Sequence, residues 1–244
     1  MRYAIVADIH SNLVALQAVL EHIGLGGPVE EVWCLGDVVG YGPAPNECIQ
    51  LLQRYSHICI AGNHDWAATG RLDVSDFNPE AKAAVLWTAS QLSAESRAYL
   101  EALQQTVVKG DFTLAHGSPR DPLWEYVISE RAAILSFEHF QTRFCLIGHS
   151  HIPLLFNLSD NGRVGLRGVP PEQPFRLDEG RWIINPGSVG QPRDGDHRAS
   201  YLVYDSDSEE FRHYRVPYDI ETTQRQMRAL GLPRPLAERL SYGW

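Results

Sequence analysis

Short apolar runs alternate with segments of helical periodicity over the first 150 residues of the chain. A short apolar run is the pattern of a buried strand. These runs predict strands at residues 3–7, 32–35, 58–61 and 144–147. Between the first two runs, residues 13–23 carry apolar side chains every three or four positions, which predicts a helix capped by Ser11 or Asn12.

Further helices and one hairpin are predicted in the same half of the chain. The helices lie at residues 46–54, 79–105 and 130–140, the second of these segments as one or two amphipathic helices. The apolar segments Thr106–Lys109 and Phe112–Ala115 flank a Gly-Asp pair, which predicts a β-hairpin.

The character of the chain changes after residue 150, where strand candidates follow one another. They lie at residues 154–158, 163–167, 182–184, 200–204 and 211–216, with a turn at residues 160–162 and a helical tail at residues 219–241. Alternating strands and helices followed by a run of strands predict a mixed α/β (α+β) fold with helices outside the sheets. We expect a single domain over residues 1–244, with a helical cover at about residues 67–105.

Composition narrows the class of protein. With 244 residues, 44% hydrophobic and 21% charged, the chain is typical of a globular protein. Its net charge of −9 disfavours generic binding to nucleic acids or to anionic membranes. No apolar run is long enough to span a bilayer, and the one at residues 3–7 is too short for a signal-peptide core. The four cysteines form no C-x-x-C pair, which favours reduced thiols and a cytoplasmic protein.

Metal-capable side chains follow five of the apolar runs, just past the C-terminal end of each. These candidate ligands are Asp8, His10, Asp37, Asn63, His116, His149 and His151. In open sheets with helical connections, binding sites form in the crevice beyond those strand ends. The spacing of Asp8 from His10, and of His149 from His151, is two residues, so an extended chain directs each pair to one side.

The chemistry of these ligands favours borderline divalent ions. Carboxylate, imidazole and amide donors suit Mn²⁺, Fe²⁺, Zn²⁺ or Co²⁺, and the lack of thiolates argues against a structural zinc site. Seven candidate ligands exceed what one ion of this kind normally takes from a protein. Two ions about 3.5–4 Å apart that share a bridging carboxylate can take up all seven ligands and still bind water and substrate. Pairs of ions at this spacing catalyse phosphoryl displacement.

The order of the motifs resembles that of the calcineurin-like metallophosphoesterase family. D-x-H, G-D, G-N-H-D, a solitary histidine and G-H-x-H follow one another from Asp8 to His151, and no ligand position departs from the pattern. The later sequence Asn185-Pro186-Gly187-Ser188 is similar to a loop of the small bacterial phosphodiesterase-type subgroup. The resemblance implies a β-sandwich flanked by helices on both outer faces, a four-layer αββα arrangement.

The resemblance also distributes the ligands between two divalent metal ions, with Mn, Fe, Zn, Ni and Co as candidates. It implies Asp8, His10 and His151 for the first ion, Asn63, His116 and His149 for the second, and Asp37 as the bridge.

For such a centre we expect an in-line attack on phosphorus by hydroxide formed from water between the two ions. His64 would protonate the leaving group, and Asp65 would orient and support the charged imidazole. Arg120 and Arg193 are candidates for contacts with a substrate phosphate, and Tyr41 for stacking on the substrate or hydrogen bonding to it.

The function expected from the sequence is therefore a dinuclear metal-dependent phosphoesterase acting on a small phosphate-ester substrate. The motifs leave phosphodiesterase, phosphoprotein phosphatase and dinucleoside polyphosphate hydrolase open as alternatives. A catalytically silent protein-binding scaffold is disfavoured because the candidate ligands and His64 are all present. A metal-storage protein is disfavoured because storage needs no proton donor. The substrate, the native metal and the oligomeric state, including a homo-oligomer, stay open.

Overall fold

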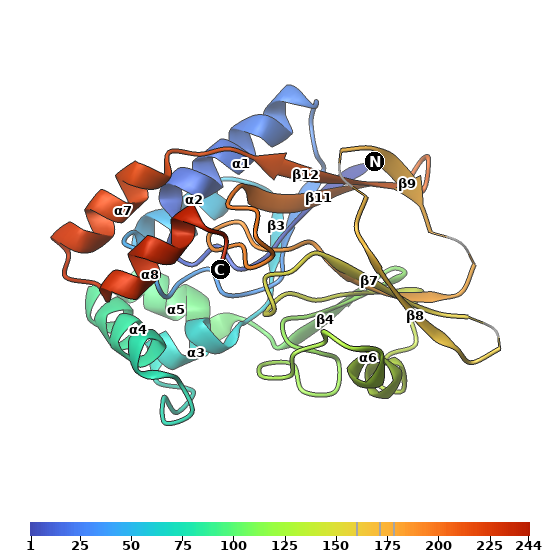
Figure 1. Cartoon of the computed structure of the whole chain (residues 1–244), viewed down its shortest axis with the longest axis horizontal. Helices are drawn as coiled ribbons and strands as arrows, with labels where there is room; N and C mark the ends of the chain where they lie inside the picture. The colour runs from blue at the N-terminus through green and yellow to red at the C-terminus, as the bar shows by residue number, and fades with distance from the viewer. Residues whose placement is uncertain (160, 171, 178) are drawn as a thin grey trace.

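Two six-stranded sheets lie face to face in the computed structural model, which describes residues 1–159, 161–170, 172–177 and 179–244 (Figure 1). The strand order is β3-β2-β1-β11-β12-β9 in the first sheet and β4-β5-β6-β10-β7-β8 in the second. Both sheets are mixed. The neighbours β1, β2 and β3 run parallel in the first sheet, and β5, β6 and β10 run parallel in the second.

The strands of the first sheet come from both ends of the chain. They are β1 (Arg2–Val6), β2 (Glu31–Cys34), β3 (His57–Cys59), β9 (Pro174–Arg176), β11 (Ala199–Asp205) and β12 (Glu210–Val216). The second sheet is built from the middle of the chain. Its strands are β4 (Thr106–Lys109), β5 (Phe112–Ala115), β6 (Phe144–Leu146), β7 (Leu154–Leu158), β8 (Val164–Gly168) and β10 (Arg181–Asn185).

Helices cover both outer faces, which makes four layers. On the side of the first sheet lie α1 (Leu13–Leu25), α2 (Pro45–Leu52), α3 (Asn63–Thr69), α4 (Pro79–Gln91), α5 (Ala94–Ala102), α7 (Ile220–Ala229), α8 (Arg234–Glu238) and the short 3₁₀ helix η1 (Arg239–Ser241). On the side of the second sheet lies α6 (Glu130–Phe137) (Figure 1). The four-layer fold expected from the sequence is thus confirmed.

The alternation of side chains along β1 separates two layers of the core. Ala4 and Val6 point outward and join the apolar cluster beneath the helices of the first sheet. Ile5 points inward and joins Trp33 and Trp182 in the cluster between the sheets. This follows from the two-residue period of a strand. A full set of apolar side chains on both faces identifies β1 as a central strand.

Most elements predicted from the periodicity are confirmed, with ends shifted by one to three residues. The segment at residues 79–105 forms two helices, α4 and α5, and the tail divides into α7, α8 and η1. Within the predicted turn, Asp160 lies outside the described residues. No helix in the described part of the chain has the length and apolar character that crossing a membrane requires.

Two elements were missed by the sequence analysis. Strand β9 has three residues, begins with Pro174 and pairs only with β12 at the edge of its sheet, so it carries no periodic signal. Helix α3 begins at Asn63, in a segment for which the sequence analysis predicted no helix. The carboxylate of Asp65 returns to the backbone N–H of Gly62 (2.9 Å) and thereby caps this helix.

Candidate metal centre

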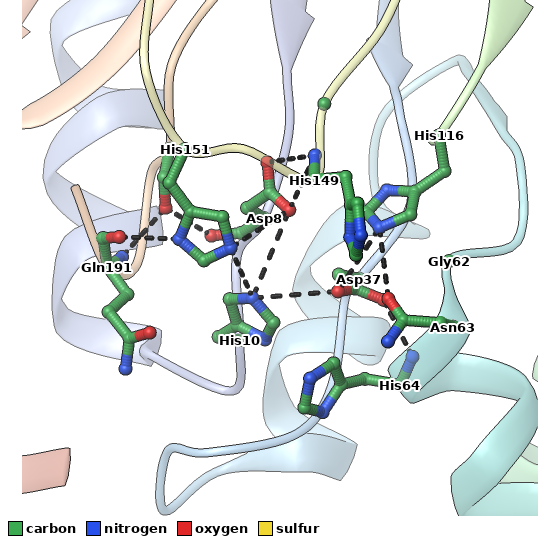
Figure 2. Close-up of polar contacts among 12 residues, drawn as sticks. Asp8, His10, Asp37, Gly62, Asn63, His64, His116, His149, His151 and Gln191 are labelled. Atoms are coloured by element: carbon green, nitrogen blue, oxygen red, sulfur yellow. Dashed lines mark hydrogen bonds and ion pairs between the residues drawn. The ribbon is translucent and has the colours of Figure 1, made fainter. Parts of the chain in front are cut away.

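All seven candidate ligands converge on one place, where strands of both sheets end (Figure 2). Asp8 and His10 follow β1, Asp37 follows β2, and Asn63 opens α3. From the second sheet, His116 follows β5, and His149 and His151 follow β6. Each of the seven side chains is at most 4% exposed, so all of them leave bulk water on folding.

The backbone at the ligands is left-handed rather than extended. Asp8, His10, His149 and His151 have φ angles of 54°, 49°, 63° and 60°. The sequence-based reason for the two pairs was therefore wrong, although each pair does face one centre. Left-handed backbone costs about 1–2 kcal/mol for a residue with a Cβ atom, and such strain gathers at functional sites. Hydrogen bonds from the N–H groups of Asp8 and His10 to the loop after β2 hold the first pair in place.

The first group of ligands contains lone pairs that face one another. The Nε2 atoms of His10 and His151 lie 3.1 Å apart, and Nε2 of His151 lies 3.3 Å from Oδ1 of Asp8. The Nδ1 atoms contact backbone carbonyls, that of Val39 at 3.1 Å and that of Gln191 at 2.6 Å. Because a carbonyl only accepts, each Nδ1 carries the proton in the neutral ring and each Nε2 presents a lone pair. A cation between these atoms satisfies all of them.

The second group has the same character. Nε2 of His116 lies 3.3 Å from Oδ2 of Asp37 and 3.3 Å from Oδ1 of Asn63, while its Nδ1 contacts the carbonyl of Leu35 at 2.8 Å. Donor atoms of Asp37, His116 and His149 also lie within 4.8 Å of one another. The residues present therefore fit a second cation.

Asp37 joins the two groups. Its Oδ2 atom lies 3.6 Å from Nε2 of His10 in the first group and 3.3 Å from Nε2 of His116 in the second (Figure 2). Its Oδ1 accepts a hydrogen bond from the backbone N–H of His64 (2.9 Å). The position between the groups is the one that a bridging carboxylate requires.

Burial and mutual charge shift the pKa values of these groups strongly. Burial raises the pKa of Asp8 to about 7 and, with the positive charge of His116, lowers the pKa of His149 to about 3. Burial also opposes the charged form of His116, but the charge and hydrogen bonding of Asp37, together with the charge of Asp8 and the carbonyl of Leu35, outweigh it and raise the pKa of His116 to about 9. Without metal, His116 therefore keeps a second proton and Asp8 is partly protonated near neutral pH, and a bound divalent cation would displace these protons.

The ring of His64 lies beside the first group, in the first turn of α3. It packs against the rings of Tyr41, His10 and Phe77, with centroids 4.4 Å, 4.9 Å and 4.9 Å away. Its Nδ1 atom is buried and has no hydrogen-bond partner among the described residues. Burial lowers the pKa of His64 to about 4. Three neighbouring rings therefore hold the imidazole of His64 in place, and its Nδ1 has no hydrogen-bond partner among the described residues.

Asp65 does not orient the ring of His64, contrary to the sequence-based expectation. Its Oδ2 accepts from the backbone N–H of Asp37 (2.8 Å) and of Gly62 (2.9 Å), and its Oδ1 accepts from that of Val39 (3.1 Å). Three backbone donors use both oxygens. The carboxylate therefore ties the loop after β2 to the start of α3 and sets the position of Asp37.

An open cavity of about 390 Å³ leads to the two groups. Two of the three expected substrate residues, Tyr41 and Arg193, line it. The third, Arg120, is not among the lining residues and forms an ion pair with Glu125. The aromatic residues Phe77, Trp124 and Tyr126 also line the cavity, and no sequence motif indicated them.

Comparison with known proteins places this centre in context. Residues 1–209 match the sequence profile of the calcineurin-like phosphoesterase superfamily domain. An uncharacterized protein of Methanocaldococcus jannaschii is 38% identical over 98% of this chain and 97% of its own length. A symmetrical bis(5'-nucleosyl)-tetraphosphatase of Pseudomonas putida is 33% identical over only 29% of this chain and 27% of that enzyme.

Solved structures give the same fold. The crystal structure of a metallophosphoesterase from Sphaerobacter thermophilus is 45% identical, covers all of both chains and superposes with a TM-score of 0.90. A hypothetical protein from Pyrococcus horikoshii OT3 superposes with a TM-score of 0.81 over 100% of this chain and 98% of that chain. Its sequence is 22% identical, so it supports the fold alone.

Proposed function

Because the chain belongs to the calcineurin-like phosphoesterase superfamily, a family of phosphate-ester hydrolases, we propose that it hydrolyses a phosphate ester with the aid of two divalent cations. One observation carries the proposal. The Nε2 lone pairs of His10 and His151 converge with the carboxylates of Asp8 and Asp37, and the protons of these two neutral rings point away from the centre.

Each group of ligands would hold one cation. Asp8, His10 and His151 form the first group and Asn63, His116 and His149 the second, with Asp37 contributing to both. Cations bound there would lower the pKa of water toward neutrality and offset the negative charge of the phosphate oxygens. Manganese, iron, zinc, nickel and cobalt all suit these ligands.

His64 is the residue we assign to the leaving group. Its ring lines the cavity beside the first group and is held by the rings of Tyr41, His10 and Phe77. An N–H of this ring that faces the cavity can donate to the departing oxygen, whose developing charge needs a proton. Asp65 acts on this step indirectly, because it anchors the backbone from which His64 and Asp37 extend.

We expect a small substrate that brings its phosphate to both groups at once. The net charge of −9 does not suit a duplex nucleic acid, whose backbone is itself negative. The partial similarity to tetraphosphatases makes a dinucleoside polyphosphate the second candidate substrate. A cytoplasmic location is consistent with four cysteines that form no disulfide.

The test combines metal analysis with an ester panel. Protein purified without chelators is analysed for bound metal, and phosphate monoesters and diesters are then assayed with Mn²⁺, Fe²⁺, Ni²⁺, Mg²⁺ and Zn²⁺ in turn. We expect about two ions per chain and turnover with at least one metal. A chain that takes up no metal and hydrolyses no ester overturns the proposal and favours a binding scaffold.

A further inference from the structure

Two arginines stand together beside the metal groups. Arg193 lies in the loop after β10, and Arg239 lies in η1, beyond residues 1–209 that match the family profile. Both guanidinium groups lie near the ring of Tyr41, with their central carbons 5.9 Å and 5.1 Å from its centroid. The fold therefore returns the C-terminal segment of the chain to the ring of Tyr41, which lines the cavity.

A single amide oxygen joins the two arginines to each other. Oε1 of Gln191 accepts a hydrogen bond from Arg193 at 2.9 Å and another from Arg239. The backbone carbonyl of Gln191 accepts the Nδ1 proton of His151, and the backbone N–H of Arg193 donates to the carbonyl of His151 (3.3 Å). The pair is thus fixed relative to the first group of ligands.

Neither arginine has an anionic partner among the described residues. Within the part of the chain that the structure describes, no carboxylate lies at salt-bridge distance from Arg193 or Arg239, whereas Arg198 and Arg215 pair with aspartates. The Nε atoms of Arg193 and Arg239 are buried without a hydrogen-bond partner. Burial, and then the charge of Arg193, lower the pKa of Arg239 to about 10.

Two close, partly buried cations with unused donors raise the free energy of the empty site. An anion that accepts hydrogen bonds from both removes that cost. Guanidinium groups bind phosphate oxygens in a fork-like geometry that an ammonium group cannot provide.

We propose that Arg193 and Arg239 bind a second phosphate group of the substrate, adjacent to the phosphate at the metal groups. The preferred substrate then carries a chain of at least two phosphates, with the reacting phosphate at the metal groups and the next one at the two arginines. This inference rests on the proposed function. A second phosphate is favoured over the reacting phosphate because Tyr41 lies between Arg239 and the metal groups. The ring of Tyr41 contacts His10 and His64, and Arg239 contacts that ring and is not among the residues that line the cavity.

Binding of non-hydrolysable anions tests the proposal. Affinities for inorganic phosphate and for methylenediphosphonate are measured calorimetrically on the manganese-loaded full chain, with bound metal checked before and after. We expect the two-phosphate probe to bind the unsubstituted protein at least about tenfold more tightly than phosphate. Arg239→Gln and Arg193→Gln should each remove about tenfold or more of that advantage, the usual size of a lost charged hydrogen bond, and leave phosphate binding within about twofold.

The matched control is Arg234→Gln. Arg234 is 82% exposed in the same C-terminal segment and pairs with Glu238 on the surface, so its loss should change neither affinity. Arg239→Lys keeps the charge without the fork and should recover only part of the diphosphonate affinity.

Three outcomes overturn the proposal. An equal loss of affinity for phosphate and for methylenediphosphonate in the arginine variants assigns the arginines to the reacting phosphate. Unchanged affinities with a lowered melting temperature make the pair a clamp for the C-terminal segment. Unsubstituted protein that holds metal and hydrolyses a nitrophenyl ester but binds both anions equally contradicts this inference alone, whereas protein that holds no metal contradicts the proposed function itself.

Discussion

The Nε2 atoms of His10 and His151 lie 3.1 Å apart, and each ring directs its Nδ1 toward a backbone carbonyl. Two neutral imidazoles cannot form a hydrogen bond between nitrogens that both lack a proton. The arrangement is stable only when a cation, or an additional proton, lies between them. The polypeptide thus holds both rings ready for a metal.

His151→Ala removes one member of this pair. We expect bound metal to fall from two ions per chain to one, because the second group keeps its ligands. Metal binds the folded state, so the metal-dependent rise in melting temperature should shrink by roughly 5–10 °C. Metal analysis and thermal denaturation with and without chelator measure both effects. Replacement of the exposed His139 should change neither, and an unchanged metal content in His151→Ala contradicts the assignment.

His64→Ala tests the proton donor separately from the metal. We expect both ions to stay bound and kcat to fall by about 10²–10⁴, the usual contribution of a general acid. The defect should be much smaller with a nitrophenyl ester, whose leaving group needs little protonation. Equal defects for nitrophenyl and alkyl esters count against His64 as the donor, and a loss that follows metal content shows a structural role.

Asp65→Ala should lower the stability of the protein and its affinity for metal. The carboxylate accepts three backbone hydrogen bonds, and hydrogen bonds to charged groups contribute about 1.5–3 kcal/mol each. We expect a loss of several kcal/mol of unfolding free energy and weaker metal binding, since Asp37 loses its anchor. Asp65→Asn, which keeps one acceptor oxygen, should be affected less. Denaturant titration with metal analysis measures this, and a variant with full stability and full metal content refutes it.

Gly40→Ala should displace the ring of His64. A Cβ at position 40 would lie 2.5 Å from Nδ1 of His64, and Gly40 has a φ of +92°. We expect kcat to fall while metal content is retained. The matched control is Gly70→Ala, whose φ is +83° but whose Cβ meets no atom within 4 Å. Gly70→Ala therefore introduces backbone strain alone, of about 1 kcal/mol. If its kcat is as low as that of Gly40→Ala, strain explains the loss of activity in both variants.

Stability at acid pH should depend on His213, a buried histidine away from the metal groups. Burial lowers its pKa to about 3, with the charges of Arg215 and Arg198 acting in the same direction and Asp196 opposing them. Its Nε2 lies 2.7 Å from Oγ of Ser200. Its Nδ1 is buried without a hydrogen-bond partner among the described residues, so nothing there stabilises the doubly protonated ring.

The unfolded chain protonates this histidine near pH 6.5, whereas the folded chain does so only near pH 3. Its contribution to stability is therefore full above pH 6.5 and declines as the pH falls from 6.5 toward 3, by up to about 1.4 kcal/mol per pH unit. In His213→Gln, the difference from the unsubstituted protein should shrink over this window. Denaturant titrations at several pH values, in chelator, test this, and a constant difference contradicts it.

Many features of this protein follow from local sequence alone. The apolar runs at residues 3–7 and 144–147 predict β1 and β6 because a strand buried on both faces requires consecutive apolar residues. The candidate ligands are likewise recognisable, because each directly follows such a run. The family resemblance follows from the order of these motifs along the chain, which requires no knowledge of distances.

Only the tertiary structure decided how these residues act together. The left-handed backbone at Asp8 and His10 depends on hydrogen bonds to the loop after β2, and the contacts of Asp65 join segments 28 and 26 residues apart. Arg239 reaches Gln191 across 48 residues because α7 and α8 pack back against the first sheet. Contacts of this kind depend on strand register and helix packing, which are set by the whole core and leave no local pattern in the sequence.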